Sequence, residues 1–304
     1  MKTSILVLAA ACLVTGCDTT EPSIHVAEPV VEAYLIAGEN LPDVRLTWTR
    51  DINTPFYPFG VGISGATVTI SLLDPAGAVV LPCEYTELFG LYRPLSCNGR
   101  EHRVVEAGRD YRLEARLSDG TLVTSLTHVP GAFQLVGQSD TELVYQSPEE
   151  FSAVITPSSY PGRRAIFVFS VVGNDVSVEN LTPFYLLDLY DAKPGDDLSE
   201  FDPDELEAVR VNSSPPLNEA NYQTEADGTF RVWMPWFAVA FYGETSVGII
   251  AIDDNLDQYL RFQAAQQGGS LAPGEIPNII DSVDGGRGLF ASMTRVVAQV
   301  KVLR

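Results

Sequence analysis

The sequence predicts an all-β protein: an N-terminal immunoglobulin/fibronectin-III-like β-sandwich, then a second, larger, mainly-β domain with one short helix. Three observations lead to this class. Apolar and polar residues alternate with a period of two over many short segments. Turn dipeptides separate these segments at short intervals. Only one window repeats its apolar residues at helical spacing. With 304 residues, the chain is long enough for two domains of ordinary size.

Residues 1–16 are expected to form a lipoprotein signal peptide. Lys2 supplies a positive charge, Ile5 to Val14 form an apolar run, and small residues precede Cys17. The run is too short for a permanent membrane span. Val14 to Cys17 resemble a bacterial lipobox, in which the cysteine thiol receives a diacylglyceryl group and becomes the new N-terminus. The alternative is a plain cleaved signal with an incidental cysteine.

Residues 17–29 would then be a lipidated tether. Their Pro, Ser and Glu content buries too little apolar surface to fold alone. Because two or more acyl chains hold a protein firmly to a bilayer, the mature chain is expected to be anchored at a membrane without spanning it. The expected location is the cell envelope, on the periplasmic or the surface face of the membrane that holds the anchor.

Residues 30–130 are expected to form the β-sandwich. Alternation is clearest in VRLTWTR (44–50), ATVTISL (66–72) and YRLEARL (111–117). Asp119-Gly120 is a typical hairpin turn, and DPAG at residues 74–77 joins two further apolar runs. Short strands at this spacing are typical of an antiparallel sandwich.

Cys83 and Cys97 remain as a single pair once the signal and the anchor have taken Cys12 and Cys17. No C-x-x-C spacing is present, so neither a redox couple nor a zinc half-site is indicated. In an oxidising compartment, the pair predicts a structural disulfide.

Residues 131–304 are expected to form the larger domain. AIFVFSVVG (165–173), FYLLDLY (184–190), TFRVWMPWFAVAFY (229–242) and SVGIIAI (246–252) are apolar on both faces, as buried strands are. The one predicted helix begins at Asp253 or Asp254 and ends before Gly268-Gly269. Residues 296–302 alternate again and predict a final strand.

Exposed aromatics are the leading binding candidates. Phe56, Tyr57 and Phe59 lie among prolines and a glycine in an expected loop. Aromatic side chains in a loop stack on sugars or enter a partner's groove, or else fold back on the edge of the sandwich. Both alternatives stay open.

An acidic stretch between Asp188 and Glu207 is a weak metal candidate. Asp196, Asp197, Asp202 and Asp204 offer the oxygen ligands that calcium prefers, but their spacing matches no EF-hand loop. Runs of like charge are usually solvated, so we expect a solvated acidic loop, no metal and no cofactor.

No catalytic residue is predicted. The sequence contains no G-x-S-x-G, no H-E-x-x-H and no P-loop motif, and His25, His102 and His128 stand apart from one another. The cluster DGGRGLFA (284–291) precedes a predicted strand, so its glycines indicate a tight turn or a close backbone approach rather than a dinucleotide site.

The mature chain is strongly acidic. Once Lys2 leaves with the signal, 18 basic residues face 40 acidic ones, a formal charge of −22. Such a surface repels phosphate backbones and anionic headgroups, which argues against nucleic-acid binding. The sequence carries no second candidate membrane segment, because residues 232–243 are apolar but too short and contain Pro235.

The order of these segments resembles a family of Gram-negative envelope lipoproteins, domain of unknown function 4249. The marks are an early strand at Val31 to Leu35, the strand at Ala66 to Asp74, and G-x-G-x-F at Gly286 to Phe290. The chain departs from the usual pattern at Ala33 or Ala37, where glycine is common, and at Asp74, which follows two leucines. The resemblance implies an exported lipoprotein of the cell envelope, at the outer membrane, often encoded beside TonB-dependent transporters. The family has no established activity and hence no catalytic residue to carry over.

These observations favour a non-catalytic accessory or ligand-binding partner of a TonB-dependent outer-membrane transporter, with a small molecule or a glycan as the ligand. Such a protein would carry a concave apolar or aromatic site. The alternatives are an envelope hydrolase with two converging carboxylates and a structural or adhesive surface protein without a pocket.

Overall fold

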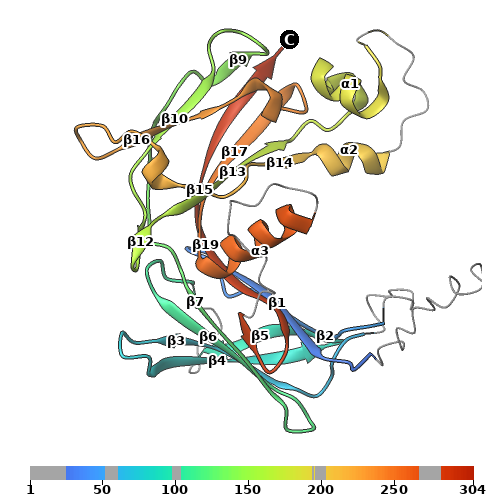
Figure 1. The fold of residues 1–304 in the computed structure, drawn as a ribbon, viewed down its shortest axis with the longest axis vertical. Coiled ribbons are helices and arrows are strands. Elements are labelled where there is room, and N and C mark those ends of the chain that lie inside the picture. Colours follow the sequence, from blue (N-terminus) through green and yellow to red (C-terminus); the bar gives the residue numbers. More distant parts are fainter. Residues whose placement is uncertain (1–24, 52–60, 98–103, 194, 196–202, 267–281) are drawn as a thin grey trace, which may run out of the picture.

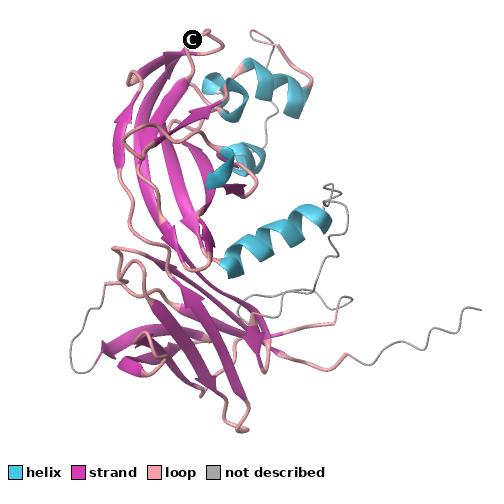
Figure 2. Cartoon of the chain, turned by 60° about the vertical axis from the view of Figure 1, so that its left-hand side comes forward, coloured by secondary structure: helices cyan, strands magenta, loops and turns pink. Residues whose placement is uncertain are grey.

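One strand near the C-terminus, β19 (Arg287–Leu303), runs through both halves of the molecule (Figure 1). The structure is a computed structural model that describes residues 25–51, 61–97, 104–193, 195, 203–266 and 282–304. Strands make up 50% and helices 15% of it, so the predicted all-β class is confirmed. Figure 2 shows the strands in two stacked lobes, with the helices on one side.

The first lobe is built from seven strands that follow one another along the chain. They are β1 (Pro29–Ile36), β2 (Val44–Trp48), β3 (Thr67–Leu73), β4 (Val79–Leu88), β5 (Leu91–Cys97), β6 (Asp110–Arg116) and β7 (Leu122–His128). The predicted alternation is confirmed, since Val31, Ala33 and Leu35 of β1 are buried and Glu32 between them is exposed. Each strand therefore turns one face to a common core.

Both predicted turns of this lobe are present. The side chain of Asp119 accepts a hydrogen bond from the backbone N–H of Thr121 at 2.9 Å. The side chain of Asp74 accepts from Ala76 at 2.9 Å and from Ala78 at 2.8 Å. Such side-chain to backbone bonds are the reason that aspartate favours turns.

The strands of the first lobe hydrogen bond in one continuous path, β1-β2-β5-β4-β3-β6-β7-β18, in which β18 is Val283–Asp284. This path curves around a single core that includes Leu46, Ile70 and Leu113 from the early strands. Val283 and Phe290, from the C-terminal end of the chain, complete the same core. The first lobe therefore needs residues from both ends of the sequence.

The second lobe packs two sheets face to face. The larger sheet contains β13 (Ile166–Gly173), β17 (Gly243–Ile252) and β19, with short β14 (Val211–Ser213), β15 (Leu217–Asn218) and β9 (Glu142–Val144) on its edges. The smaller sheet has the order β16 (Phe230–Met234), β10 (Phe151–Ile155) and β8 (Leu135–Gln138). A further pair, β11 (Ser159–Tyr160) and β12 (Arg163–Arg164), stands apart. Aromatic and β-branched side chains fill the space between the two sheets.

Met293 marks where β19 changes partner. Before it, β19 pairs in parallel with β1 as far as Ile36, and after it, β19 pairs antiparallel with β17 from Ile252 onward. The large sheet thus runs across residue 130, and the division into domains 30–130 and 131–304 stays a prediction. A shared strand couples the two lobes through backbone hydrogen bonds.

The predicted helix near residue 253 is confirmed as α3 (Asp254–Gln266). It packs over the place where β19 changes partner, with Leu256 buried against Ile252 and Leu289. Asp253 caps it, because its Oδ1 accepts the backbone N–H of Leu256 at 2.9 Å. In Figure 1, α3 lies between the two lobes.

Two further helices contradict the sequence prediction. FYLLDLY, expected as a strand, lies in α1 (Pro183–Tyr190), and α2 is Pro203–Val209. Proline favours the first position of a helix, and Pro183 follows an extended Thr182, so the chain begins a helix there. Periodicity cannot separate a short apolar strand from a short buried helix. TFRVWMPWFAVAFY is also a strand only to Met234, because Pro235 leads into a 3₁₀ turn, η4 (Trp236–Ala238).

Candidate functional site

An apolar pocket opens along one edge of the second lobe. The edge exists because β16 ends the smaller sheet while β14 and β15 are only short additions to the larger one. The two sheets are therefore not joined by backbone bonds on this side. The resulting cavity has a volume of about 320 Å³, which is at the small end of the range for small-molecule sites.

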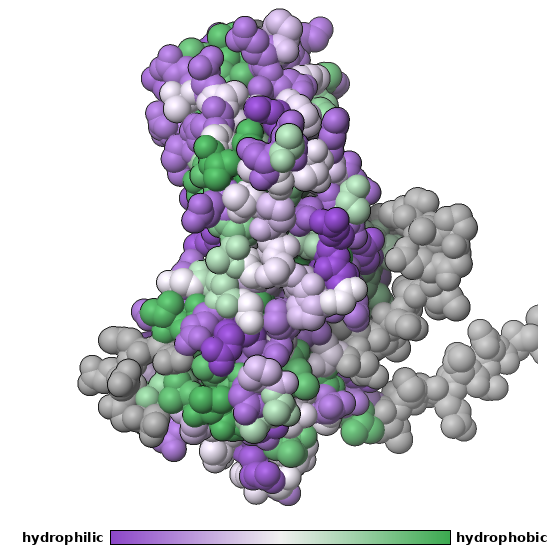
Figure 3. Space-filling model, turned by 90° about the vertical axis from the view of Figure 1, so that its left-hand side faces the viewer, coloured by the Kyte–Doolittle hydropathy of each residue, from purple (hydrophilic) through white to green (hydrophobic). Residues whose placement is uncertain are grey.

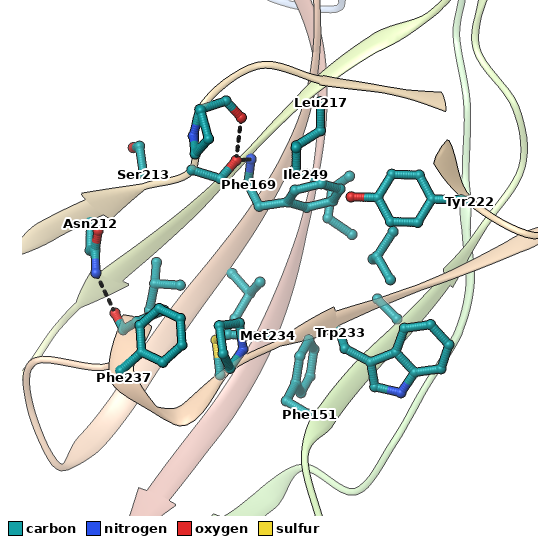
Figure 4. Close-up of a pocket in the computed structure, with 18 residues that line it drawn as sticks. Phe151, Phe169, Asn212, Ser213, Leu217, Tyr222, Trp233, Met234, Phe237 and Ile249 are labelled. Carbon is teal, nitrogen blue, oxygen red and sulfur yellow. Dashed lines mark hydrogen bonds between the residues drawn. The ribbon is translucent and has the colours of Figure 1, made fainter. Parts of the chain in front are cut away.

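The walls of the pocket come from strands that are distant in sequence (Figure 4). Phe169 and Ile249 belong to the larger sheet, Phe151 and Met234 belong to the smaller sheet, and Tyr222 closes one end. The remaining lining residues are Ala153, Val171, Asn212, Ser213, Ser214, Pro215, Leu217, Val232, Trp233, Pro235, Phe237, Ala238 and Val247. The surface of the cavity is thus mainly aliphatic and aromatic.

Aromatic rings hold the shape of the pocket. Tyr222 meets Phe169 edge to face at 6.1 Å between ring centroids and stacks on Phe230 at 5.6 Å. Such pairs stabilise beyond the area that they bury. Burial raises the pKa of Tyr222, so the phenol stays neutral at physiological pH. Trp233 and Phe237 remain 58% and 51% exposed, which leaves two large rings at the rim.

Polar side chains lie at one end of the pocket, and they form hydrogen bonds to other groups of the protein. Asn212 donates through Nδ2 to the hydroxyl of Tyr185 at 2.7 Å and to the carbonyl of Ala238 at 3.3 Å. Ser214 donates to the carbonyl of Pro215 and accepts from the backbone N–H of Phe169. These bonds fix the rim of the pocket, so a ligand is selected mainly by shape and apolar contact.

The lining contains no aspartate, glutamate, histidine, lysine, arginine or cysteine. General acid–base or nucleophilic chemistry needs such groups within hydrogen-bond reach of a substrate. This part of the described molecule can therefore hold a neutral, apolar ligand but offers no titratable group besides the neutral phenol of Tyr222.

A second cavity, the junction cavity, has a volume of about 500 Å³ and lies where the two lobes meet, with both ionisable and apolar side chains in its lining. His128 and Asp110 form a pair at 2.7 Å between Nδ1 and Oδ1. Asp254 pairs with Arg163 at 2.7 Å. Each of these two carboxylates therefore has a close hydrogen-bond partner in a neighbouring side chain.

Asp253 is the most strongly perturbed acid of this cavity. Burial raises its pKa to about 6, against the opposing effect of hydrogen bonds from Thr127 and Leu256. Its Oδ2 accepts the hydroxyl of Thr127 at 2.6 Å, and that hydroxyl also lies 2.6 Å from the hydroxyl of Ser292. Asn255 donates to the carbonyls of Leu126 and Phe290 beside it. This cluster ties the start of α3 to the first lobe.

Several predicted site residues lie outside the described residues. These are Cys17, the aromatic candidates Phe56, Tyr57 and Phe59, and the acidic candidates Asp196, Asp197 and Asp202. His102, for which no site role was predicted, also lies outside the described residues. Asp204 is described and is exposed in the first turn of α2. Within the described ranges, no group of three or more His, Cys, Asp or Glu side chains is placed to hold a metal ion.

Cys83 and Cys97 face each other on β4 and β5 and form a disulfide. The Nε2 of His25 lies 3.4 Å from the hydroxyl of Thr49, whereas His128 lines the junction cavity. Among the described helices, none is long and apolar enough to cross a membrane.

The predicted role of the glycine cluster is also confirmed. A Cβ on Gly288 would overlap the carbonyl oxygen of Val31, and a Cβ on Gly286 would lie 2.6 Å from the carbonyl oxygen of Pro29. The two glycines therefore allow β19 to approach β1 closely enough to pair with it.

Sequence reasoning missed the pocket. One signal was available, because FRVWM of β16 alternates with Phe230, Val232 and Met234 inward, which places the large apolar Trp233 on the outer face. An aromatic residue at an outward position is a reason to look for a binding surface. The other walls come from strands that only the folded chain brings together.

A family model described as "Domain of unknown function (DUF4249)" matches residues 19–298. The comparison with curated proteins gave no match.

Among solved structures, the chain is similar to trypsin-activated alpha-2-macroglobulin from Escherichia coli, with 12% identity, a TM-score of 0.23, and coverage of 90% of this chain and 15% of that one. The native conformation of E. coli alpha-2-macroglobulin has 13% identity and a TM-score of 0.23, with coverage of 91% of this chain and 14% of that one. A tetra-tandem repeat in the extending region of a large adhesion protein has 10% identity and a TM-score of 0.22, with coverage of 90% of this chain and 49% of that one. The chain therefore spans less than half the length of each of these structures.

Proposed function

Because this chain belongs to the family of the domain of unknown function DUF4249, we propose that it is an outer-membrane-associated lipoprotein that binds a ligand without catalysis. In this proposal it acts as an accessory partner of a TonB-dependent transporter, and the ligand occupies the apolar pocket of the second lobe. The lipid on Cys17 anchors the mature chain in the membrane.

The observation that carries the proposal is the chemistry of the pocket. Its walls are aromatic and aliphatic, and apart from the neutral phenol of Tyr222 its lining contains no titratable side chain that could act as an acid, a base or a nucleophile. A binding protein needs a concave apolar site with a few polar groups to orient the ligand. Asn212, Ser213 and Ser214 are the polar side chains at one end of this site.

The proposal separates this function from its two alternatives. A purely structural or adhesive protein has no need for a preformed aromatic cavity. A carboxylate-dependent hydrolase needs two carboxyls on either side of the scissile bond. Of the three carboxyls of the junction cavity, Asp110 pairs with His128, Asp254 pairs with Arg163, and Asp253 accepts hydrogen bonds from Thr127 and Leu256 as the cap of α3. The alternatives therefore have less support than ligand binding.

Binding in the pocket can be tested with the neutral dye N-phenyl-1-naphthylamine, whose emission rises in apolar surroundings. The protein is used in solution as its Cys17→Ser form. The double variant Trp233→Ser, Phe237→Ser removes the two rim rings, which are half-exposed and contribute little to the core. We expect dye affinity to fall about tenfold, since two ring contacts contribute about 1.4 kcal/mol together.

Phe89→Ser is the matched control, because Phe89 is an exposed aromatic residue of the first lobe, outside the pocket. It should bind the dye as the parent does. Equal loss of affinity in the control and the pocket variant would contradict the assignment of the pocket.

The partner is tested separately. The tagged, lipidated protein is extracted from its native envelope in mild detergent, and co-purified proteins are identified by mass spectrometry. A TonB-dependent transporter in a near-stoichiometric amount is the expected result. Recovery of the lipoprotein alone would contradict the accessory role and leave a solitary binding protein.

A further inference from the structure

An exposed aromatic side chain sits in a strained position at one end of the first lobe. Phe89 is 83% exposed, more than any other large apolar residue of the described chain. It lies in the two-residue turn between β4 and β5, whose flanking residues Leu88 and Leu91 pair across the hairpin. Two-residue hairpin turns favour Asn-Gly or Asp-Gly, because both central residues have positive φ.

The backbone of Phe89 has a φ of +52°, and that of Gly90 has a φ of +76°. A positive φ is normal for glycine and is an outlier for a bulky residue. The turn also packs closely against the backbone of Gly62, because a Cβ on Gly90 would lie 2.5 Å from the Cα of Gly62. The fold thus fixes a strained turn that presents a phenyl ring to the surroundings, and strain of this kind is concentrated at functional positions.

The same end of the lobe receives the N-terminal segment of the chain. Pro29, at the start of β1, pairs with Trp48 of β2, and the backbone N–H of Trp48 donates to the carbonyl of Val61, next to Gly62. The backbone N–H of Leu46 donates to the carbonyl of Gly90. The turn and the entry of the chain are therefore neighbours on one sheet.

Two further exposed apolar side chains belong to the segments just described, one to the N-terminal segment and one to β4. Val26, three residues before β1, is 74% exposed, and Leu88 is half-exposed beside Phe89. We call Val26, Leu88 and Phe89 the apolar tip. Figure 3 shows hydrophobic side chains at the surface of both lobes, over a broader area on the first lobe. Among the exposed apolar side chains of the described residues, Phe89 is the most exposed and the one fixed in a strained turn, which makes it the candidate for a contact with a membrane.

The position of the proposed lipid anchor favours a membrane over a protein partner as the surface that the apolar tip contacts. Cys17 is eight residues before His25, where the described chain begins. Eight extended residues span at most about 30 Å. A lipid on Cys17 thus keeps the apolar tip close to the bilayer, and the tether makes this second contact effectively intramolecular.

We propose that the apolar tip inserts Phe89 into the interfacial region of the lipid bilayer that holds the anchor, so that the first lobe faces the membrane and the second lobe stands away from it. This proposal rests on lipidation of Cys17 in the proposed function. Since the mature chain carries a formal charge of −22, the contact is expected with neutral headgroups and through apolar insertion, not through attraction to anionic lipid.

The test uses the mature chain from Cys17 onward. Cys17 is its one free thiol, because Cys83 and Cys97 form a disulfide, so it can be coupled to a maleimide lipid in phosphatidylcholine vesicles. Phe89→Trp places a fluorophore at the tip, and lipids with brominated acyl chains quench it on insertion. The parent protein gives the background of Trp48, Trp233 and Trp236.

Val136→Trp is the matched control, because Val136 is 52% exposed on β8 of the second lobe. After subtraction of the background, we expect brominated lipid to quench the tip fluorophore of Phe89→Trp at least twofold more than the fluorophore of Val136→Trp. Equal quenching in the two variants would overturn the proposal.

A second variant tests whether the ring has a structural role instead. Phe89→Asn suits a positive φ, so its Tm should equal or exceed that of the parent. A clear fall in Tm would mean that the ring packs on the protein, and the proposal would fail. The anchor itself is tested by the mass of Cys17 in protein extracted from its own membrane. A missing acyl mass would contradict the proposed lipoprotein independently of the quenching result, which uses a chemical tether.

Discussion

Asp253→Asn should increase the stability of this protein at neutral pH. The carboxylate of Asp253 is 1% exposed, and burial raises its pKa to about 6 from an ordinary 3.8. The folded state therefore binds a proton more readily than the unfolded state does. Between these two pKa values, stability falls as pH rises, and above pH 6 the cost of the buried charge is fully present.

The size of the effect follows from the shift. Each pKa unit corresponds to 1.36 kcal/mol, so the charge at Asp253 costs up to about 3 kcal/mol of folding free energy above pH 6. Asparagine removes this charge and keeps the contacts. Its Oδ1 can accept the backbone N–H of Leu256, and its Nδ2 can donate to Thr127, whose hydroxyl proton then goes to Ser292.

Urea unfolding at pH 7.5 and pH 5 measures the effect. We expect Asp253→Asn to be more stable than the parent at pH 7.5 and the difference to shrink at pH 5. Carboxyls with lowered pKa values, such as Glu87 and Asp119, titrate below this window and do not contribute to the difference.

Asp253→Ala is the control for the hydrogen bonds. It loses the cap of α3, at about 1 kcal/mol, and leaves Thr127 without its acceptor. It should therefore be less stable than Asp253→Asn at both pH values. The reasoning fails if the asparagine variant is as unstable as the alanine variant at pH 7.5, since the charge itself would then hold the lobes together.

Three further predictions follow from the anchor, the disulfide and the strand pairing. Cys17→Ser should release the protein from membranes, and a mutant that still fractionates with them in the absence of detergent would reject the lipid anchor. Cys83→Ser opens a loop of 14-residue separation and should lower stability by about 3 kcal/mol; an unchanged Tm, or free thiols in the native protein, would argue against a structural disulfide with Cys97. Gly288→Ala, at a φ of +115° and against a carbonyl of β1, should cost more than about 2 kcal/mol or prevent folding, whereas Gly137→Ala in an open site should not. Similar Tm values for the two glycine variants would contradict the close approach of β1 and β19.

Local signals were enough to predict much of the fold. The alternation of Val31, Ala33 and Leu35 predicts a strand with one buried face. The two aspartates at positions 253 and 254 predict the start of α3. Both features depend on residues within a few positions of each other, so they can be read from one segment of sequence.

Other features depend on contacts that no local pattern encodes. The alternation predicts a final strand only over residues 296–302, whereas β19 begins at Arg287 and divides at Met293 between β1 and β17. Asp253 reads as a helix cap, whereas its bond to Thr127 joins residues 126 positions apart. The pocket brings Phe151, Phe169 and Ile249 together from three strands, so its shape could not be derived from any of them separately.

Native mass spectrometry of the lipidated protein, released from its own envelope in mild detergent, tests ligand binding most directly. The account predicts a neutral, apolar small molecule retained by the parent and lost from the Trp233→Ser, Phe237→Ser variant. Bare parent protein, or the same adduct in both forms, would contradict a ligand site in the second lobe.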